Sequence, residues 1–270
     1  MRSLDFPAEE LAVPVPGLRA VRWTTDELHS GIKEYYAVGR TERGQSEFWS
    51  RGRVWRGSPG SIQVKEAGDV HRDVARDGPT TFVVVTLPVA DVQRVREEGR
   101  HLAHPHLERD DERARPFHRL LDAVCSGADR LSVEVALAEA VSAFATISKR
   151  TPDHTRPVRR AIEYLHARTA ESITLEELAS HADLDKFHLC RAFRAQVGMP
   201  PHAYLVNLRV LRAKELLARG MRASEVAPIV GLYDQSQQTR HFRRIVGVTP
   251  GRFGKLRGSA SFREGTPSGR

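Results

Sequence analysis

The sequence predicts a multidomain protein with both α and β structure: a β-barrel or sandwich with two following helices, and then an all-α domain of two helix-turn-helix units. Three observations predict this fold class. A helical pattern occurs twice within residues 173–257, short β-type segments recur over residues 18–87, and the net charge belongs to the helical part alone. A length of 270 residues suits about two domains.

The helical repeat is the most specific of these observations. One copy starts at Leu175 and the other at Ser224, and equivalent residues lie 48 positions apart before the turn and 49 apart after it. A pattern that resumes its register after a one-residue insertion indicates a duplicated unit. The equivalent pairs are Leu178 and Val226, Ala179 and Ala227, Leu184 and Leu232, Arg191 and Arg240, Phe193 and Phe242, Arg194 and Arg243, Val197 and Val246, Gly198 and Gly247, Pro201 and Pro250, and Tyr204 and Phe253.

Each copy has the pattern of a helix, a tight turn and a second helix. In the first copy, Asp185 is a good N-cap for a helix over residues 186–197, because its carboxylate can accept from free amides of the first turn. In the second copy, Gly231 ends the first helix, and residues 234–236 can cap a helix that runs to Val246. This is the helix-turn-helix motif, whose second helix fits the DNA major groove.

The second helices carry side chains suited to DNA. Arg can bind guanine and Gln can bind adenine through paired hydrogen bonds, whereas Lys and Arg toward a helix flank suit phosphates. The candidates for base edges are Arg191, Gln235, Gln237 and Arg240. The candidates for phosphates are Lys186, Arg194, Arg243 and Arg244. The alternative, solvated faces of amphipathic helices, is less favoured because both copies carry arginine at equivalent positions.

The charge distribution favours the same interpretation. Residues 157–257 hold 17 Lys and Arg against 9 Asp and Glu, whereas residues 1–156 hold 23 against 24. The net charge of +8 is therefore the charge of the repeat region. A basic block joined to a neutral one is typical of a polyanion-binding module fused to another domain.

The segment GLYDQSQQTRHFRRIVGVTPGRF at residues 231–253 resembles the signature of the AraC/XylS family of bacterial transcription regulators, and residues 191–217 resemble it more weakly. The resemblance implies a C-terminal DNA-binding domain, residues 157–257, of seven helices, in which residues 201–217 bridge two units. It also implies that both second helices enter successive major grooves, about 34 Å apart. By similarity, the base contacts are Phe187, Cys190, Arg191, Gln235, Ser236, Gln237, Thr239 and Arg240.

Three residues depart from the pattern of the family. Gln238 takes the place of the apolar residue matched by Leu189, so we expect its helix to be less firmly seated. Leu232 stands where an aromatic residue is usual. Pro228 is interpreted as lying early in its helix, where losing an amide costs least. None of the three removes a donor that faces the groove.

The N-terminal part is predicted to be β-rich after an irregular arm at residues 1–17, which is either a tail or a lid over a pocket. Segments with β-branched and aromatic residues are separated by Gly, Pro and Asp every eight to twelve residues, which is typical of a sandwich or small barrel. These segments are residues 18–24, 35–40, 46–52, 53–57, 61–69 and 81–87.

Residues 57–71, GSPGSIQVKEAGDVH, resemble the second half of a cupin motif, and a cupin barrel, placed at residues 18–100, is the effector-binding domain of many AraC-type regulators. The metal-binding set of a cupin is incomplete, because His29 and Glu34 lack a second His and His71 alone cannot close a site. We therefore expect no metal or other cofactor. Residues that can line an effector pocket, or belong to ordinary core and surface, are Trp23, Glu34, Tyr36, Trp49, Trp55 and His71.

Residues 107–150 are predicted to form a helical pair that covers the barrel or makes a dimer interface, the latter by resemblance. Its apolar stripes are Phe117, Leu120, Leu121 and Val124, then Val133, Leu137, Val141, Phe144 and Ile147. Before the pair, His101, His104 and His106 are interpreted as a solvated loop cluster rather than a metal site. Residues 151–156 are predicted to be a linker, and residues 258–270 a disordered tail.

No apolar run approaches the roughly 20 residues of a membrane span, and the N-terminus lacks a secretory apolar segment. Two cysteines without metal-type spacing, Cys125 and Cys190, suit a reducing compartment. We therefore expect a cytoplasmic transcription regulator, activator or repressor, that binds double-stranded DNA, responds to a small-molecule effector and is not an enzyme. The alternatives are a cupin-type metalloenzyme with a basic C-terminal module and a non-specific DNA-binding protein.

Overall fold

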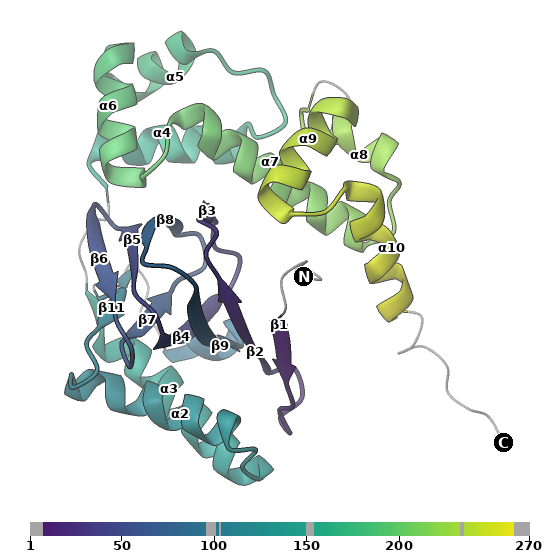
Figure 1. Cartoon of the computed structure of the whole chain (residues 1–270). Helices are drawn as coiled ribbons and strands as arrows, with labels where there is room; N and C mark the ends of the chain where they lie inside the picture. Colours follow the sequence, from purple (N-terminus) through teal and green to yellow (C-terminus); the bar gives the residue numbers. More distant parts are fainter. Residues whose placement is uncertain (1–7, 96–100, 103, 150–153, 233–234, 262–270) are drawn as a thin grey trace, which may run out of the picture. The chain divides into compact units, whose positions relative to one another are not determined.

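The computed structural model describes residues 8–95, 101–102, 104–149, 154–232 and 235–261, and it divides near His154 into two compact units (Figure 1). The first unit contains the β-sheets and the second is helical.

The sheet unit contains two antiparallel sheets, as the spacing of the β-type segments predicts. The larger sheet has the strand order β1-β2-β9-β4-β7-β11 and the smaller has the order β3-β8-β5-β6. In the larger sheet the strands are β1 (Ala8–Leu11), β2 (Arg19–Thr25), β9 (Thr80–Leu87), β4 (Tyr36–Arg43), β7 (Ile62–Lys65) and β11 (His106–Leu107). In the smaller sheet they are β3 (Ser30–Ile32), β8 (Val70–Arg76), β5 (Ser46–Ser50) and β6 (Arg53–Gly57).

The two faces of the larger sheet have different partners. On its outer face, side chains such as Val38, Val83 and Val85 are buried in one core with the helices that follow the sheets. On its inner face, Phe82 and Val84 form a separate cluster with Ala37. The separation follows from the pleat, because successive side chains of a strand point to opposite faces.

Helices cover the outer face of the larger sheet (Figure 1). They are α1 (Val89–Val95), a 3-10 turn η1 (Glu112–Ala114), α2 (Arg115–Cys125) and α3 (Arg130–Thr146). Every residue of the two predicted apolar stripes is buried in this core, so the helical pair covers the sheet, which is one of the two roles that the sequence left open. Two short strands, β10 (His101–Leu102) and β12 (Ser148–Lys149), pair beside the helices.

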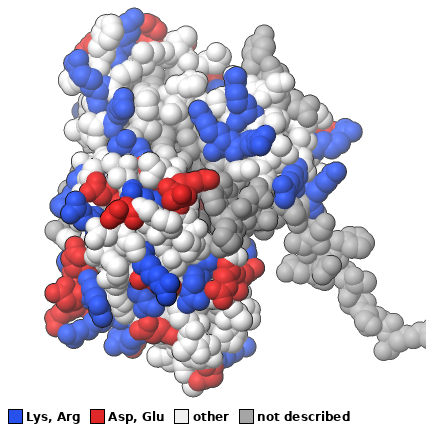
Figure 2. All heavy atoms as spheres, viewed as in Figure 1, with Lys and Arg blue, Asp and Glu red and all other residues white. Residues whose placement is uncertain are grey.

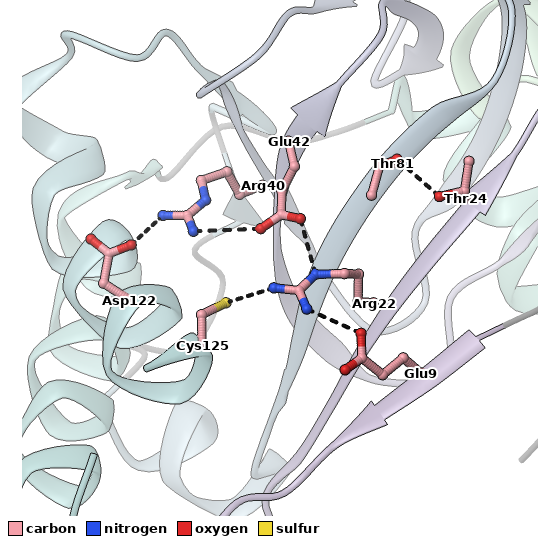
Figure 3. Close-up of polar contacts among 8 residues, drawn as sticks. All are labelled: Glu9, Arg22, Thr24, Arg40, Glu42, Thr81, Asp122 and Cys125. Atoms are coloured by element: carbon pink, nitrogen blue, oxygen red, sulfur yellow. Dashed lines mark hydrogen bonds and ion pairs between the residues drawn. The ribbon is translucent and has the colours of Figure 1, made fainter. Parts of the chain in front are cut away.

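A chain of ion pairs joins strands β1, β2 and β4 to helix α2 on this outer side (Figure 3). Arg22 contacts Glu9 and Glu42, each at 3.0 Å, and Arg40 lies 2.5 Å from Asp122. Arg40 is also 3.8 Å from Glu42, so the two arginines share one carboxylate. Because most of these side chains are partly exposed, we regard this series of ion pairs as fixing the positions of the strands and not as a large source of stability.

The helical unit consists of seven helices among the described residues, the number that the family resemblance implies. They are α4 (Arg156–Ala167), α5 (Leu175–Ala182), α6 (Lys186–Val197), α7 (Pro201–Ala218), α8 (Ala223–Ile229), α9 (Gln235–Val246) and α10 (Pro250–Ser261). Helix α7 is the predicted bridge between the two repeats (Figure 1). The core of the helical unit shows the duplication. The ring of Tyr204 lies edge-on to that of Phe193 with 5.6 Å between ring centres, and the ring of Phe253 lies edge-on to that of Phe242 with 5.5 Å between ring centres.

The structure corrects four predictions of the fold. The tail is not disordered from residue 258, because helix α10 extends to Ser261. The arm is not irregular throughout, since residues 8–11 form strand β1 on the edge of the larger sheet. His106 is not solvated, because it belongs to strand β11 and is buried. Pro228 is the last residue but one of α8 rather than an early one, so its missing amide falls where an intrahelical hydrogen bond would otherwise form.

Candidate nucleic-acid interface

In the first helix-turn-helix repeat, local hydrogen bonds fix the angle between α5 and α6. Asp183 adopts a left-handed conformation at the end of α5, and the amide of Leu184 donates to the carbonyl of Ala179 at 3.1 Å. Asp185 then caps α6 as predicted, because its Oδ1 accepts from the amides of Phe187 and His188 at 3.0 and 2.9 Å. These amides hold the pKa of Asp185 below its ordinary value.

Helix α6 has one buried face and one exposed face. Leu189, Phe193 and Val197 are buried, whereas Phe187 has 68% of its surface exposed. Arg191 and Arg194 are exposed and Cys190 is half-buried, all on the side away from this core. A helix face with an exposed phenylalanine beside exposed arginines is unfavourable in water. The same side chains suit contacts with base edges, thymine methyl groups and phosphates.

Lys186, a predicted phosphate contact, is the first residue of α6 and already has an acidic partner. Its Nζ lies 2.8 Å from Oε1 of Glu176 on α5, and this hydrogen bond raises the pKa of Lys186. The pair is exposed, so a phosphate can compete with Glu176 for the ammonium group.

In the second helix-turn-helix repeat, the turn between α8 and α9 has the same backbone hydrogen bond as the turn between α5 and α6. The amide of Leu232 donates to the carbonyl of Ala227 at 3.0 Å, which matches the bond from Leu184 to Ala179. Gly231 has a φ of 75°, and a Cβ there would lie 2.4 Å from the carbonyl oxygen of Ala170. Glycine is therefore required both by the backbone conformation and by the close approach of the segment after α4.

Helix α9 presents a longer row of polar side chains. Ser236, Arg240, Arg243 and Arg244 are exposed, and Gln237 and Thr239 are half-buried. A surface depression of about 790 Å³ is lined by Ser236, Thr239, Arg240, Arg243 and Arg244. The side chain of Gln235, another predicted base contact, lies outside the described residues.

Gln238 occupies the core position that its alignment with Leu189 predicts. It is fully buried with Phe242 and Val246, and neither its Oε1 nor its Nε2 has a hydrogen-bond partner among the described residues. Leaving a buried polar group without a partner costs about 1–3 kcal/mol, so this helix is less well stabilised than α6.

The helical unit and the sheet unit differ in surface charge. Figure 2 shows Lys and Arg gathered over the helical unit with few acidic residues, whereas both signs alternate over the sheet unit. On α9, burial and the charges of Arg244 and Arg240 lower the pKa of His241, so the positive field of that helix comes from its arginines.

The structure brings together some of the predicted effector residues in the sheet unit. His71 is buried and stacks on Phe48 at 5.1 Å between ring centres, and the ring of Trp55 lies 6.0 Å from that of His106. Trp23 packs with Phe82 at 5.6 Å. All six residues belong to the inner faces of the two sheets, as the alternation of each strand requires.

The other predicted effector residues do not lie there. Tyr36 is placed wrongly by the sequence, because it faces the helices and contacts Phe144 at 5.7 Å in the outer core. Trp49 follows Phe48 on β5 and therefore points to the opposite side of its sheet. Glu34 is exposed beyond strand β3.

Sequence reasoning missed most of the polar residues of the inner faces. Thr41, Ser46 and His106 are buried, and each has a side-chain atom without a hydrogen-bond partner among the described residues. Charged residues also face inward, namely Lys33, Lys65, Asp73 and Arg76. A usable signal was present in β7, where Gln63 and Lys65 alternate with apolar Ile62 and Val64.

Comparison with known proteins relates both units to one kind of regulator. A model of an AraC-like ligand-binding domain matches residues 16–145, and a model of a helix-turn-helix domain matches residues 178–255. An uncharacterised helix-turn-helix-type transcriptional regulator of Bacillus subtilis, YbfI, is 27% identical over 216 residues, which are 75% of this chain and 78% of that protein. An AraC-like transcription regulator of Streptomyces antibioticus is 34% identical over 99 residues, 36% of this chain and 33% of that one.

A solved structure shares the fold over most of the chain. The crystal structure of apo ToxT from Vibrio cholerae matches with a TM-score of 0.52, covering 92% of this chain and 99% of that chain at 13% sequence identity. Within the part of the chain that the structure describes, no helix is long and apolar enough to span a membrane.

Proposed function

This chain belongs to the AraC-type transcription regulators and carries an N-terminal ligand-binding domain, and from this premise we propose that α6 and α9 read operator DNA in two successive major grooves. The base contacts are Phe187, Cys190, Arg191, Gln235, Ser236, Gln237, Thr239 and Arg240. The phosphate contacts are Lys186, Arg194, Arg243 and Arg244. The protein acts in the cytoplasm, where its DNA lies.

One observation carries this proposal: two helices at equivalent positions of a duplicated unit each bury their apolar face and expose donors. Arg191 and Arg240 are equivalent in the repeat, and both are exposed. Their helices are oriented by equivalent core contacts, namely Phe193 with Tyr204 and Phe242 with Phe253. Two similar reading surfaces on one chain suit a site with two half-sites in tandem.

The test is selection of DNA by the full-length protein from a random library, followed by footprinting of the enriched sequences. We expect two short protected segments about one helical turn apart. Arg191→Ala and Arg240→Ala should each blur a different segment of the enriched motif. The control is Arg130→Ala, which removes an exposed arginine of α3 in the other unit and should leave the motif unchanged. Uniform protection without an enriched motif would support the non-specific alternative.

The inner faces of the two sheets form the effector site in this proposal. The AraC-like ligand-binding model covers this unit, and Trp23, Trp55 and His71 contribute rings to these faces. Thr41, Ser46 and His106 support it, because each has a buried polar atom with no partner among the residues that the structure describes, and such groups need water or a ligand. A screen of metabolites by thermal shift tests it, because a ligand present at 100 times its Kd adds about 2.7 kcal/mol to the stability of the folded state.

A second copy of the chain is the expected partner of helix α3. The face of α3 opposite its buried stripe contains Leu131 and Val135, which are 70% and 52% exposed, together with exposed Ala138 and Ser142. These residues follow the spacing of a helix–helix seam. We expect Val135→Glu to shift the protein from dimer to monomer in sedimentation, while Glu139→Ala, on a neighbouring exposed position, leaves the dimer intact.

The proposed role is regulatory and not enzymatic, as the names of the related proteins suggest. A stoichiometric iron, manganese or zinc in the purified protein would instead favour the metalloenzyme alternative.

A further inference from the structure

One guanidinium on the inner face of the sheet unit has an unused donor. Nε of Arg76 donates to the carbonyl of Glu27 at 3.0 Å, and Nη2 donates to Asp73 at 2.5 Å. Nη1 has no partner among the described residues, although the side chain is only 6% exposed. The guanidinium carbon lies 5.0 Å from the ring centre of Phe82, so this donor belongs to the inner face.

Two ammonium groups accompany this donor. Nζ of Lys65 lies 6.0 Å from the ring centre of Trp23, which packs against Phe82. Lys33 is close enough for its charge to act on Lys65. Neither lysine forms an ion pair within the described part of the chain.

The positive charge is only partly compensated, because the carboxylates of Asp73 and Glu34 act on the lysines without outweighing burial. Burial, together with the charge of Lys33, lowers the pKa of Lys65 to about 7, and burial also lowers the pKa of Lys33. His71 is held neutral, because burial lowers its pKa to about 3. Burial opposes the charge of Asp73, but the hydrogen bond from His71 and the charge of Arg76 outweigh it and keep the pKa of Asp73 low.

A charge count then gives the sign of the missing group. The carboxylate of Asp73 is already bound by Arg76 and accepts from Nε2 of His71 at 3.0 Å. It therefore forms its ion pair with one cation, and neither lysine has an ion-pair partner among the described residues, although Asp73 acts on both and Glu34 acts on Lys33. Holding two like charges at a poorly solvated face is unfavourable unless an anion binds there.

We propose that the effector of this regulator is an organic anion whose charged group binds Lys33, Lys65 and Nη1 of Arg76 and whose apolar body lies against Trp23 and Phe82. The proposal rests on the assignment of the inner faces as the effector site and names the class of ligand. An uncharged ligand of the same shape would leave both ammonium groups desolvated and unpaired.

The test uses full-length protein and pairs of probes that differ only in charge. The pairs are phenylacetate with phenylacetamide, and octanoate with octanamide. We expect at least one acid to raise the Tm and to bind in calorimetry, and its amide to bind about tenfold or more weakly. Equal binding of acid and amide, or no binding of either acid, would overturn the proposal.

Two variants separate binding from folding. Lys65→Met keeps the length of the side chain and removes a buried charge, so we expect it to fold at least as stably as the parent while losing about tenfold or more in affinity for the acid. Arg56→Met, on an outward-facing arginine that is 72% exposed, is the matched control and should bind the acid normally. Normal acid binding by Lys65→Met would also overturn the proposal.

The pH dependence gives a second readout. The groups that face Lys65 are Lys33, His71, Asp73 and Arg76, and His71 stays neutral above pH 4. Because Lys65 is charged below its pKa of about 7 and neutral above it, affinity for the acid should fall between pH 6 and pH 8 in the parent but not in Lys65→Met. DNA selection with the same protein preparations tests the regulatory function separately. If the DNA motif is recovered while the acids fail to bind, the regulatory function stands and only the proposal of an anionic effector fails.

Discussion

The two helix-turn-helix units share one backbone plan but differ in how their second helices are held. Both pack an aromatic ring of the following helix against a buried phenylalanine, Phe193 in α6 and Phe242 in α9. At the next core position, however, α6 places Leu189 and α9 places Gln238, and both are fully buried. The same core position therefore holds an apolar side chain in one unit and, in the other, an amide with no hydrogen-bond partner in the described part of the chain.

The second helices of the two helix-turn-helix units, α6 and α9, also differ in charge. Lys186 of α6 is paired with Glu176, whereas Arg240, Arg243 and Arg244 of α9 have no acidic partner in the described part of the chain. Duplication has therefore produced a firmly seated helix with a partly neutralised surface and a less firmly seated helix with a stronger positive field. We expect the first to contribute more to stability and the second more to salt-dependent affinity.

The largest expected effect comes from exchanging the two core residues. Leu189→Gln should destabilise the helical unit by about 2–5 kcal/mol, because it removes apolar packing and buries an amide. Gln238→Leu should stabilise it by about 1–3 kcal/mol, because it removes two buried polar atoms that have no partner among the described residues. Urea unfolding of both variants measures the difference. A loss of stability in Gln238→Leu would mean that the amide is satisfied in the folded state.

The next effect distinguishes base contacts from phosphate contacts on α9. Arg240→Ala should cost about 1–3 kcal/mol at one base pair and relax specificity there. Arg243→Ala should weaken binding to all sequences alike and reduce the salt slope by about 1. Binding titrations against single-base variants of the selected site, at several salt concentrations, separate the two. Equal losses on every sequence for both variants would show that Arg240 is not a base contact.

A smaller effect concerns the apolar contact that only α6 offers. If Phe187 contacts a thymine methyl group, replacing that thymine with deoxyuridine should cost the parent about 0.8 kcal/mol, the value of one buried methylene. The same replacement should cost Phe187→Ala nothing, so the two changes form a double-mutant cycle. Additive losses at every thymine would remove Phe187 from the base contacts.

The smallest effect tests the pair that partly neutralises α6. Glu176→Ala should free Lys186 for a phosphate, raise affinity at low salt and steepen the salt slope by up to about 1. Glu134→Ala makes the same charge change in the other unit and is the control. An unchanged slope would place Lys186 outside the interface.

Local patterns predicted the helical unit well. The bounds of α6 and the C-terminal end of α9 match the predicted helices, and the Asp185 cap was identified from its position. The burial of Gln238 followed from its alignment with Leu189. Pro228 was misplaced because α8 is short and begins after Arg222, which is not a conventional N-cap residue, although Glu225 at the N3 position accepts from the amide of Arg222.

Prediction was less complete in the sheet unit, where the partner of each residue lies far away in sequence. Strand β1 was missed because four residues carry little periodicity, and only pairing with β2 makes them a strand. His106 was taken for a loop residue for the same reason, since its burial depends on pairing with Gln63 in β7. Tyr36 was assigned to the wrong face because alternation shows that two faces exist but not which one is the interior.

The sequence by itself determined the duplicated helical unit, the charge that this unit carries and the residue types on its two exposed helices, because a helix is set by neighbours three and four positions apart. Only the tertiary structure decided that Lys33, Lys65 and Arg76 share one inner face with Trp23 and Phe82. These residues come from separate strands and loops, and strand register, which no local pattern fixes, is what places them together.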